Sequence, residues 1–210
     1  MRTDILDLVA SRTGHFRLES GHHASRWLDL ERLCMDVRAV ERLAADLASL
    51  LAKHAFDVVC GPLVEGAFVA LMVAGRLSKP FVYAERIAPT QAAGMFGVTY
   101  EVPAAIRHEL RGRRVAVVND FTSAGSAVRG TVRDVRGCGG VVAAVGSLVL
   151  LGSEAARFCE KEGFPLEALE RLPFEIWEPS MCPLCTAGEP LIEPLATASS
   201  RAMENPAGGR

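Results

Sequence analysis

The stretch from residue 114 to residue 127 joins an apolar strand to a polar turn, and its composition suits the binding of a phosphate group. Apolar residues fill positions 115–118, and the polar pair Asn119 and Asp120 follows them. A turn rich in small and hydroxyl-bearing residues then opens a helix. Backbone N–H groups at a helix N-terminus point toward a bound anion, and the helix dipole favours negative charge there. This order predicts a site for a phosphate monoester.

The turn offers hydroxyl donors from Thr and Ser, and its Ala and Gly let the backbone approach a ligand closely. The predicted phosphate-binding residues are Thr122, Ser123, Ala124, Gly125, Ser126 and Ala127. An ordinary strand-to-helix connection capped by Ser or Thr has a similar sequence, so the turn alone leaves both interpretations open.

A second candidate loop lies between an apolar segment at 57–60 and a helical segment that extends through Leu77. Glycines in such a loop either expose backbone amides to a diphosphate or make a tight turn for steric reasons alone. The residues in question are Gly61, Pro62, Leu63, Val64, Glu65 and Gly66. The two loops together favour the binding of phosphate groups.

Strands and helices alternate around these loops. Short apolar runs predict strands, and amphipathic spacing predicts a helix after Asp36. Further helices are expected up to Leu77 and from Gly125 to about Gly137. The predicted strands cover residues 57–60, 80–84, 115–118 and 141–150. Because nearly uniformly apolar strands are buried on both faces, the expected fold class is α/β, with a central parallel sheet and helices on both faces. Ligands of such sheets bind beyond the carboxyl ends of the strands, where both loops lie.

The two ends of the chain have a different pattern. Residues 3–12 predict a short helix with Thr3 as its N-cap, and the alternation from residue 15 to residue 30 predicts two strands and a turn. Residues 196–210 are rich in Ala, Ser, Pro and Gly and predict a disordered tail. We expect one domain over residues 1–195.

The composition narrows the class of protein. The chain has 210 residues, of which 50% are hydrophobic and 23% are charged, as in an ordinary globular α/β protein. A formal net charge of -2 gives no reason to expect nucleic acid or an anionic membrane as a partner. We recognise neither a signal peptide nor a membrane-spanning run, and six scattered cysteines do not form a disulfide framework. A cytoplasmic location is expected.

The two loops resemble those of type I phosphoribosyltransferases, and two further segments resemble orotate phosphoribosyltransferases in particular. Residues 14–25 look like the N-terminal strand and turn that form part of a hood over the base, and residues 177–191 resemble the C-terminal segment of one bacterial branch. The resemblance covers about residues 13–192. It implies the type I phosphoribosyltransferase fold, with a small hood formed by about residues 13–32 and the C-terminal segment.

The resemblance also implies a role for each candidate residue. The 122–127 turn would hold the 5-phosphate of phosphoribosyl pyrophosphate, and the 61–66 loop its pyrophosphate. Mg²⁺ would be held mainly by this ligand. Asn119 and Asp120 would bind the ribose, with Asp120 and Arg86 as the catalytic candidates.

On the side of the base, Phe16 and His23 would belong to the hood. A solvated turn histidine is the alternative for His23. Family members are usually homodimers, so the resemblance implies a homodimer.

The chain departs from the family pattern in three places. Asn119 replaces the first of two acids and carries no negative charge. The segment from residue 87 to residue 106 has no Lys or Arg where relatives carry basic residues, and Arg86 is the nearest cation before it. Leu150 and Leu151 replace an Asp-Arg pair that meets the pyrimidine, so the base that the protein accepts stays open.

Two functions of different class follow. The first is an enzyme that resembles orotate phosphoribosyltransferase and transfers ribose 5-phosphate to a nitrogenous base, in pyrimidine nucleotide biosynthesis by resemblance. The second is a catalytically impaired homologue that binds a phosphoribosyl or nucleotide phosphate and acts as a regulator. A Rossmann oxidoreductase fits less well, because no G-x-G-x-x-G follows an early strand.

Cys182 and Cys185 form a CxxC pair near the C-terminus. A structural zinc normally takes four ligands, and the sequence contains no second CxxC or HxxxH pair. The other cysteines are isolated and mostly flanked by apolar residues, as buried structural cysteines are. We therefore expect reduced, packed thiols. Half of a zinc site, including one shared between two chains, is the alternative.

Overall fold

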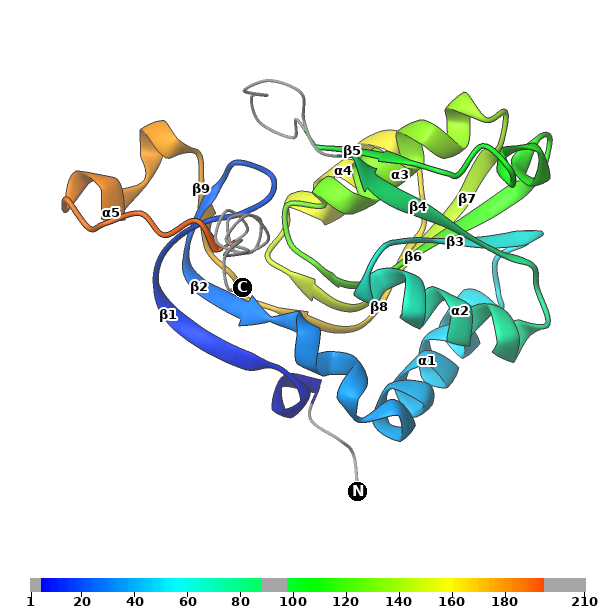
Figure 1. Ribbon diagram of the computed structural model, residues 1–210, viewed down its shortest axis with the longest axis horizontal. Helices are drawn as coiled ribbons and strands as arrows, with labels where there is room; N and C mark the ends of the chain where they lie inside the picture. The colour runs from blue at the N-terminus through cyan, green and yellow to red at the C-terminus, as the bar shows by residue number, and fades with distance from the viewer. Residues whose placement is uncertain (1–4, 88–97, 195–210) are drawn as a thin grey trace, which may run out of the picture.

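The computed structural model describes residues 5–87 and 98–194, which form a six-stranded and a three-stranded sheet (Figure 1). The tail predicted at 196–210, the cap predicted at Thr3 and residues 88–97 of the segment 87–106 lie outside the described residues. Within those residues, no helix is long and apolar enough to cross a bilayer.

The six-stranded sheet confirms the expected α/β class, because all of its strands except β5 are parallel. Its order is β5-β4-β3-β6-β7-β8, and β5 is antiparallel to β4 at one edge. The strands are β3 (Val58–Pro62), β4 (Phe81–Ile87), β5 (Thr99–Glu101), β6 (Arg114–Thr122), β7 (Val141–Leu151) and β8 (Leu166–Leu172).

Helices cover both faces of this sheet (Figure 1). On one face lie α1 (Val37–Leu51) and α2 (Glu65–Leu77), and on the other lie α3 (Ser126–Gly137) and α4 (Glu154–Glu162). Side chains such as Val40 and Val73 pack in the first core, and Val132 packs in the second. Asp36 begins α1 as expected, because its Oδ1 accepts the N–H of Ala39 at 2.9 Å.

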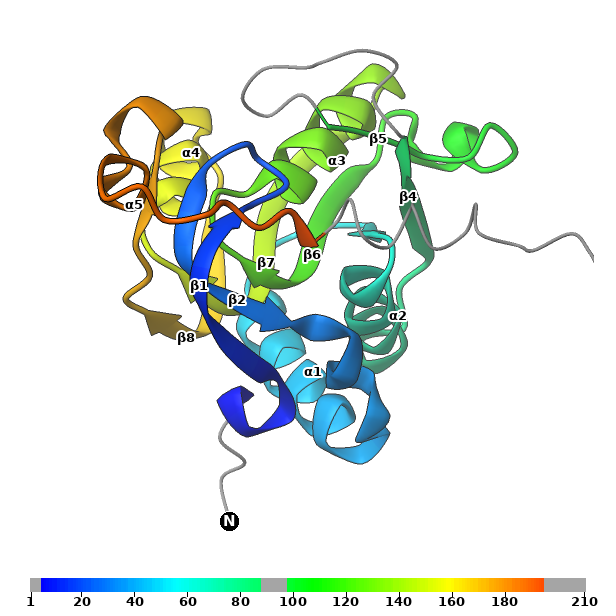
Figure 2. The same cartoon turned by 60° about the vertical axis from the view of Figure 1, so that its left-hand side comes forward.

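The three-stranded sheet and the residues after it form a separate layer beside the cavity described below. It contains β1 (Ala10–Arg17), β2 (His23–Asp29) and β9 (Ile176–Trp177), and α5 (Pro183–Thr186) follows β9. Figure 2 shows the C-terminal segment running back beside β1. We call this sheet together with residues 178–192 the hood. Short 3₁₀ helices complete the fold: η1 (Ile5–Leu8), η2 (Leu30–Met35), η3 (Arg107–Leu110) and η4 (Pro179–Met181).

Several predicted boundaries differ from the structure. The N-terminal helix covers only Ile5–Leu8, because the chain from Ala10 pairs with β2 and this tertiary pairing overrides the local helical pattern. β6 extends through Thr122, so the polar pair and the first hydroxyl lie within the strand. β3 likewise includes Gly61 and Pro62, which the sequence pattern placed in the loop after the strand.

The sequence patterns missed α4 and β8. The β8 sequence, LEALERL, has three charged residues, and six of its seven residues are half-buried, so it lacks the apolar run that identified the central strands. Its position at the sheet edge next to β7 explains this composition.

Candidate functional site

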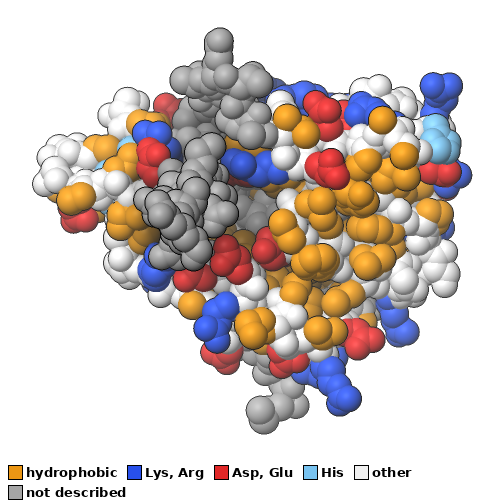
Figure 3. Space-filling model, in the orientation of Figure 1, with side chains coloured by type: hydrophobic (Ala, Val, Ile, Leu, Met, Phe, Trp, Pro, Cys, Tyr) orange, Lys and Arg blue, Asp and Glu red, His pale blue; other side chains and the backbone are white. Residues whose placement is uncertain are grey.

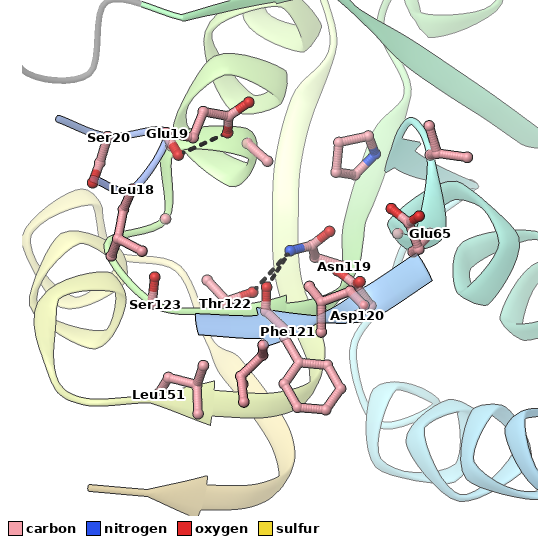
Figure 4. A pocket seen from close by; sticks show the side chains of 18 of the residues that line it. Leu18, Glu19, Ser20, Glu65, Asn119, Asp120, Phe121, Thr122, Ser123 and Leu151 are labelled. Atoms are coloured by element: carbon pink, nitrogen blue, oxygen red, sulfur yellow. Dashed lines mark hydrogen bonds between the residues drawn. The ribbon is translucent and has the colours of Figure 1, made fainter. Parts of the chain in front are cut away.

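A cavity of about 480 Å³ lies between the hood and the carboxyl ends of the central strands (Figure 4). Both predicted loops contribute to its wall. Because β3 and β6 are adjacent parallel strands, the loops that follow them meet at the same edge of the sheet. The sequence alone predicted this meeting.

The predicted phosphate turn follows β6 directly. Gly125 has a φ of 81°, a left-handed conformation that favours glycine, and α3 begins at the next residue. Arg129 stabilises the turn, because its Nε donates a hydrogen bond to the carbonyl of Ala124 at 3.2 Å. Of the six predicted residues, five line the cavity, whereas Ala124 is buried beneath the turn.

The predicted pyrophosphate loop contributes residues 62–66 to the cavity wall. The peptide bond between Leu63 and Val64 is cis. Gly61 does not line the cavity, because it lies under α2, where an added Cβ would come within 2.5 Å of the Cβ of Ala70. For Gly61, the steric interpretation therefore holds: the glycine lets helix α2 pack closely on β3.

Asn119 anchors the end of β6 through a buried network of hydrogen bonds (Figure 4). Its Nδ2 donates to the carbonyl of Phe121 at 2.9 Å and to Oγ1 of Thr122 at 3.2 Å. Oγ1 of Thr122 lies 3.0 Å from Oγ of Ser147 on β7, and Ser147 donates to the carbonyl of Asp120 at 2.8 Å. Both amide hydrogens of Asn119 are therefore used in hydrogen bonds within the protein. An ionised aspartate at this position could donate neither of them.

The other side of Asn119 explains why position 66 is glycine. A Cβ on Gly66 would overlap Oδ1 of Asn119, so the start of α2 can approach β6 only without a side chain there. The hydroxyl of Thr122 is also engaged in the network, where it contacts both Asn119 and Ser147.

Asp120 lines the cavity although its side chain is almost entirely buried. The pKa of this carboxyl is raised to about 7, mainly by burial and to a smaller extent by the nearby negative charge of Glu65, while backbone N–H groups oppose the shift. When a buried carboxyl with a raised pKa is ionised, the approach of a cation stabilises its charge. Asp120 therefore suits a site where positive charge develops.

Glu19, at the tip of the hood between β1 and β2, was not predicted from the sequence. Its carboxylate accepts three hydrogen bonds: from Nε of Arg86 at 2.6 Å, from the hydroxyl of Tyr100 at 3.0 Å and from Oγ of Ser126 at 2.9 Å. Burial raises the pKa of Tyr100, so its hydroxyl keeps the proton that it donates. Glu19 thus accepts hydrogen bonds from donors that a bound anion would otherwise use. Two of these donors, Arg86 and Ser126, are predicted site residues.

The remaining predicted residues are divided between the cavity and the hood. Leu151 lines the cavity, whereas Leu150 is buried behind it. Phe16 and His23 differ from the expectation for the base side, since both are buried in the hood and neither lines the cavity. His23 lies beside His15 instead, with Nδ1 of His23 2.9 Å from Nε2 of His15. Further wall residues that sequence reasoning missed are Arg26, Trp27, Tyr100 and Phe174.

No family model matches the chain. Among curated proteins, the orotate phosphoribosyltransferase of Heliobacterium modesticaldum is 33% identical over 183 residues, which cover 86% of this chain and 88% of that protein. The orotate phosphoribosyltransferase of Caldanaerobacter subterraneus is 30% identical over 181 residues, again 86% of this chain and 88% of that protein. The chain belongs to the orotate phosphoribosyltransferase family.

Solved structures agree with this fold. The orotate phosphoribosyltransferase of Aeropyrum pernix superposes with a TM-score of 0.58 at 26% identity, covering 80% of this chain and 89% of that one. The Mycobacterium tuberculosis orotate phosphoribosyltransferase in complex with phosphoribosyl pyrophosphate gives a TM-score of 0.58 at 23% identity, covering 80% of this chain and 91% of that one. The type I phosphoribosyltransferase fold is thereby established for this member of the family.

In this orotate phosphoribosyltransferase family member, the buried Asp120 predicts a pH-dependent stability. The carboxyl has an ordinary pKa of 3.8 and a pKa of about 7 in the folded protein, so between these values the unfolded chain binds fewer protons. Stability therefore falls as the pH rises from about 4 to about 7. Asp120→Asn removes this effect. The quantity to compare is the free energy of unfolding of the variant minus that of the wild type. We expect this difference to be larger at pH 8 than at pH 5 by on the order of 2 kcal/mol.

Urea unfolding of both proteins at the two pH values measures this difference. Asp46→Asn, an exposed position on α1, is the control and should show no such dependence. If Asp120→Asn changed the free energy of unfolding equally at pH 5 and pH 8, the raised pKa of Asp120 would be contradicted.

The contacts of Glu19 predict competition with an anionic ligand. Glu19→Gln removes the negative charge that Arg86 and Ser126 now meet, so inorganic phosphate or ribose 5-phosphate should bind about three- to tenfold more tightly. Isothermal titration calorimetry measures the affinity. Glu31→Gln, on the same cavity wall, controls for the general loss of charge. Weaker binding by Glu19→Gln than by the control would show that Glu19 holds the site together instead.

Proposed function

We propose that this protein is a phosphoribosyltransferase that transfers ribose 5-phosphate from phosphoribosyl pyrophosphate to a nitrogenous base. One observation carries the proposal: the loops after the adjacent strands β3 and β6 face a single cavity, and Asp120 lies in the wall between them. The family to which the chain belongs supports the same reaction. We treat residues 1–195 as one domain of this enzyme.

In the proposed complex, the two ends of the substrate are held by backbone groups. The turn at 122–127 binds the 5-phosphate at the N-terminus of α3, where the helix dipole favours its charge. Residues 62–66 bind the pyrophosphate. The ribose then lies over the end of β6, close to Asp120.

Asp120 acts on the reacting sugar. As the bond between the sugar and pyrophosphate breaks, positive charge develops on the ribose ring, and a carboxylate fixed nearby stabilises that charge. Because Asp120 is only 4% exposed, water screens this interaction less than it would at the surface. Asn119 adds no negative charge, so Asp120 is the acid that carries this step.

The cavity wall also suits a magnesium ion. Asp120 and Glu65 offer carboxylate oxygens. The negative charge of Glu65 raises the pKa of Asp120, and a bound divalent cation would offset this charge. We propose that Asp120 and Glu65 would support a Mg²⁺ held mainly by the substrate, and that the ion would supply positive charge to the pyrophosphate. Arg86 supplies a further cation from β4 once Glu19 releases it.

The base is proposed to bind at the hood end of the cavity. Trp27, Leu151 and Phe174 give this region apolar and aromatic surface that suits a planar ring. Arg26 lines the same region, and its guanidinium offers a cation for an acidic base such as orotate.

A homodimer is proposed from the resemblance, and α2 offers a surface for it. Val64, Phe68 and Leu71 are exposed by 54%, 43% and 52% at helical spacing, and Figure 3 shows apolar side chains gathered on this face. Contiguous exposed apolar surface of this kind marks interaction sites. The cytoplasmic location expected from the sequence stays a prediction.

The regulatory alternative is not favoured, because the relatives reported above are orotate phosphoribosyltransferases along most of their length. One experiment separates the two functions. The purified protein is mixed with phosphoribosyl pyrophosphate, Mg²⁺ and orotate, and the loss of orotate absorbance is followed. Adenine, uracil and other bases are tested by chromatography, and binding of phosphoribosyl pyrophosphate is measured by calorimetry in parallel.

We expect turnover with at least one base, with orotate the first candidate. Asp120→Asn should lower the rate by about 10²- to 10³-fold while phosphoribosyl pyrophosphate still binds, and Asp46→Asn should leave the rate unchanged. Tight binding with no turnover of any base would support the regulator instead. Absence of both binding and turnover would refute both functions.

A further inference from the structure

A cluster of four metal-ligand residues lies in the hood, away from the cavity. His15 on β1, His23 on β2, and Cys182 and Cys185 around the start of α5 each place one ligand atom within 4.8 Å of the others. The cysteines are more than 150 residues from the histidines in sequence. The fold therefore supplies the second pair of ligands that the sequence pattern lacked.

The distances within the cluster match a small tetrahedral site. Nε2 of His15 lies 3.5 Å from Sγ of Cys182 and 3.7 Å from Sγ of Cys185. Nδ1 of His23 lies 3.2 Å from Sγ of Cys185 and 2.9 Å from Nε2 of His15. Zinc with two nitrogen and two sulfur ligands holds neighbouring ligand atoms about 3.3–3.8 Å apart. Small shifts of the His23 ring bring the cluster to this geometry.

The hydrogen bonding of His15 prepares it for a metal. Its Nδ1 lies 2.8 Å from the carbonyl oxygen of Glu189, which can only accept, so Nδ1 carries the proton. The lone pair is then on Nε2, the atom that faces His23 and the two cysteines. Metal-binding histidines usually have such a partner on the other ring nitrogen, because it fixes the tautomer and the ring orientation.

We propose that His15, His23, Cys182 and Cys185 bind one Zn²⁺ as a structural site. Two thiolates and two imidazoles favour zinc over Mg²⁺ or Ca²⁺, which prefer oxygen ligands. The coordination is closed, because protein ligands take all four positions around the ion. His15, His23 and Cys182 are 2%, 3% and 1% exposed, whereas Cys185 lies at the surface. A closed site of this type stabilises a fold and leaves no position for a substrate.

The zinc would hold two parts of the hood together, the β1–β2 hairpin and the C-terminal segment after β9. The C-terminal segment lies along β1 through hydrogen bonds from the N–H of Ile192 to the carbonyl of His15 and from the N–H of Arg17 to the carbonyl of Ile192. β9 adds only two residue pairs to β2. The metal joins both histidines of the hairpin to the segment after β9, and the hairpin tip between those histidines carries Glu19, which reaches the cavity.

The metal content of the full chain tests the site. Protein purified without a metal-affinity step or chelator should contain about one zinc per chain by inductively coupled plasma mass spectrometry. Cys182→Ser and Cys185→Ser should lose most of this zinc. Cys34→Ala, a partly buried thiol outside the cluster, should retain it. Zinc-free wild type that takes up no zinc when its thiols are reduced would overturn the proposal, as would a Cys182–Cys185 disulfide in that protein.

A second measurement on the wild type covers the case in which the variants do not fold. After removal of zinc by a chelator, addition of Co²⁺ should produce the intense visible bands of a tetrahedral ion and a thiolate charge-transfer band. Addition of zinc should displace the cobalt and abolish these bands. Removal of zinc by the chelator should lower the melting temperature of the protein by several degrees. A weak spectrum typical of octahedral cobalt, with no thiolate band, would refute the assignment.

Discussion

The hydrogen bonds that Asn119 makes at the end of β6 are the constraint on which the candidate site depends. Its amide donates to the Phe121 carbonyl and the Thr122 hydroxyl, and Ser147 of β7 completes the network. All of these groups are buried, so each bond that is lost would leave a polar atom without a partner, at a cost of about 1–3 kcal/mol. The network fixes the direction in which the chain leaves the strand toward the predicted phosphate turn.

The same residue relates the two loops to each other. Oδ1 of Asn119 lies against Gly66, so the start of α2 and the end of β6 approach more closely than a side chain at position 66 would allow. Asp120 is then held between the loops, with a raised pKa that results mainly from burial. The asparagine that replaces the first acid of the family pair thus positions the remaining acid and both predicted phosphate loops.

Much of this arrangement could be predicted from the sequence, because its causes are local. Apolar runs identified the central strands, and Gly125 and the hydroxyl-bearing turn marked the start of α3. The rest depends on tertiary contacts that no local pattern records. Glu19 reaches Ser126 only because the hood folds over the cavity, and His15 and His23 meet Cys182 only because the C-terminal segment returns to β1. For this reason the sequence pattern around Cys182 and Cys185 did not reveal the two histidines that lie beside them.

Calorimetry of ribose 5-phosphate binding to the wild type and to Asn119→Asp tests the central claim most directly. The substitution restores the acid pair of the family but removes both amide donors. If the donors hold the turn, the variant should melt at a lower temperature and bind ribose 5-phosphate at least about tenfold more weakly. Equal or tighter binding, together with an unchanged melting temperature, would mean that Asn119 is only a missing carboxylate and that the network does not organise the site.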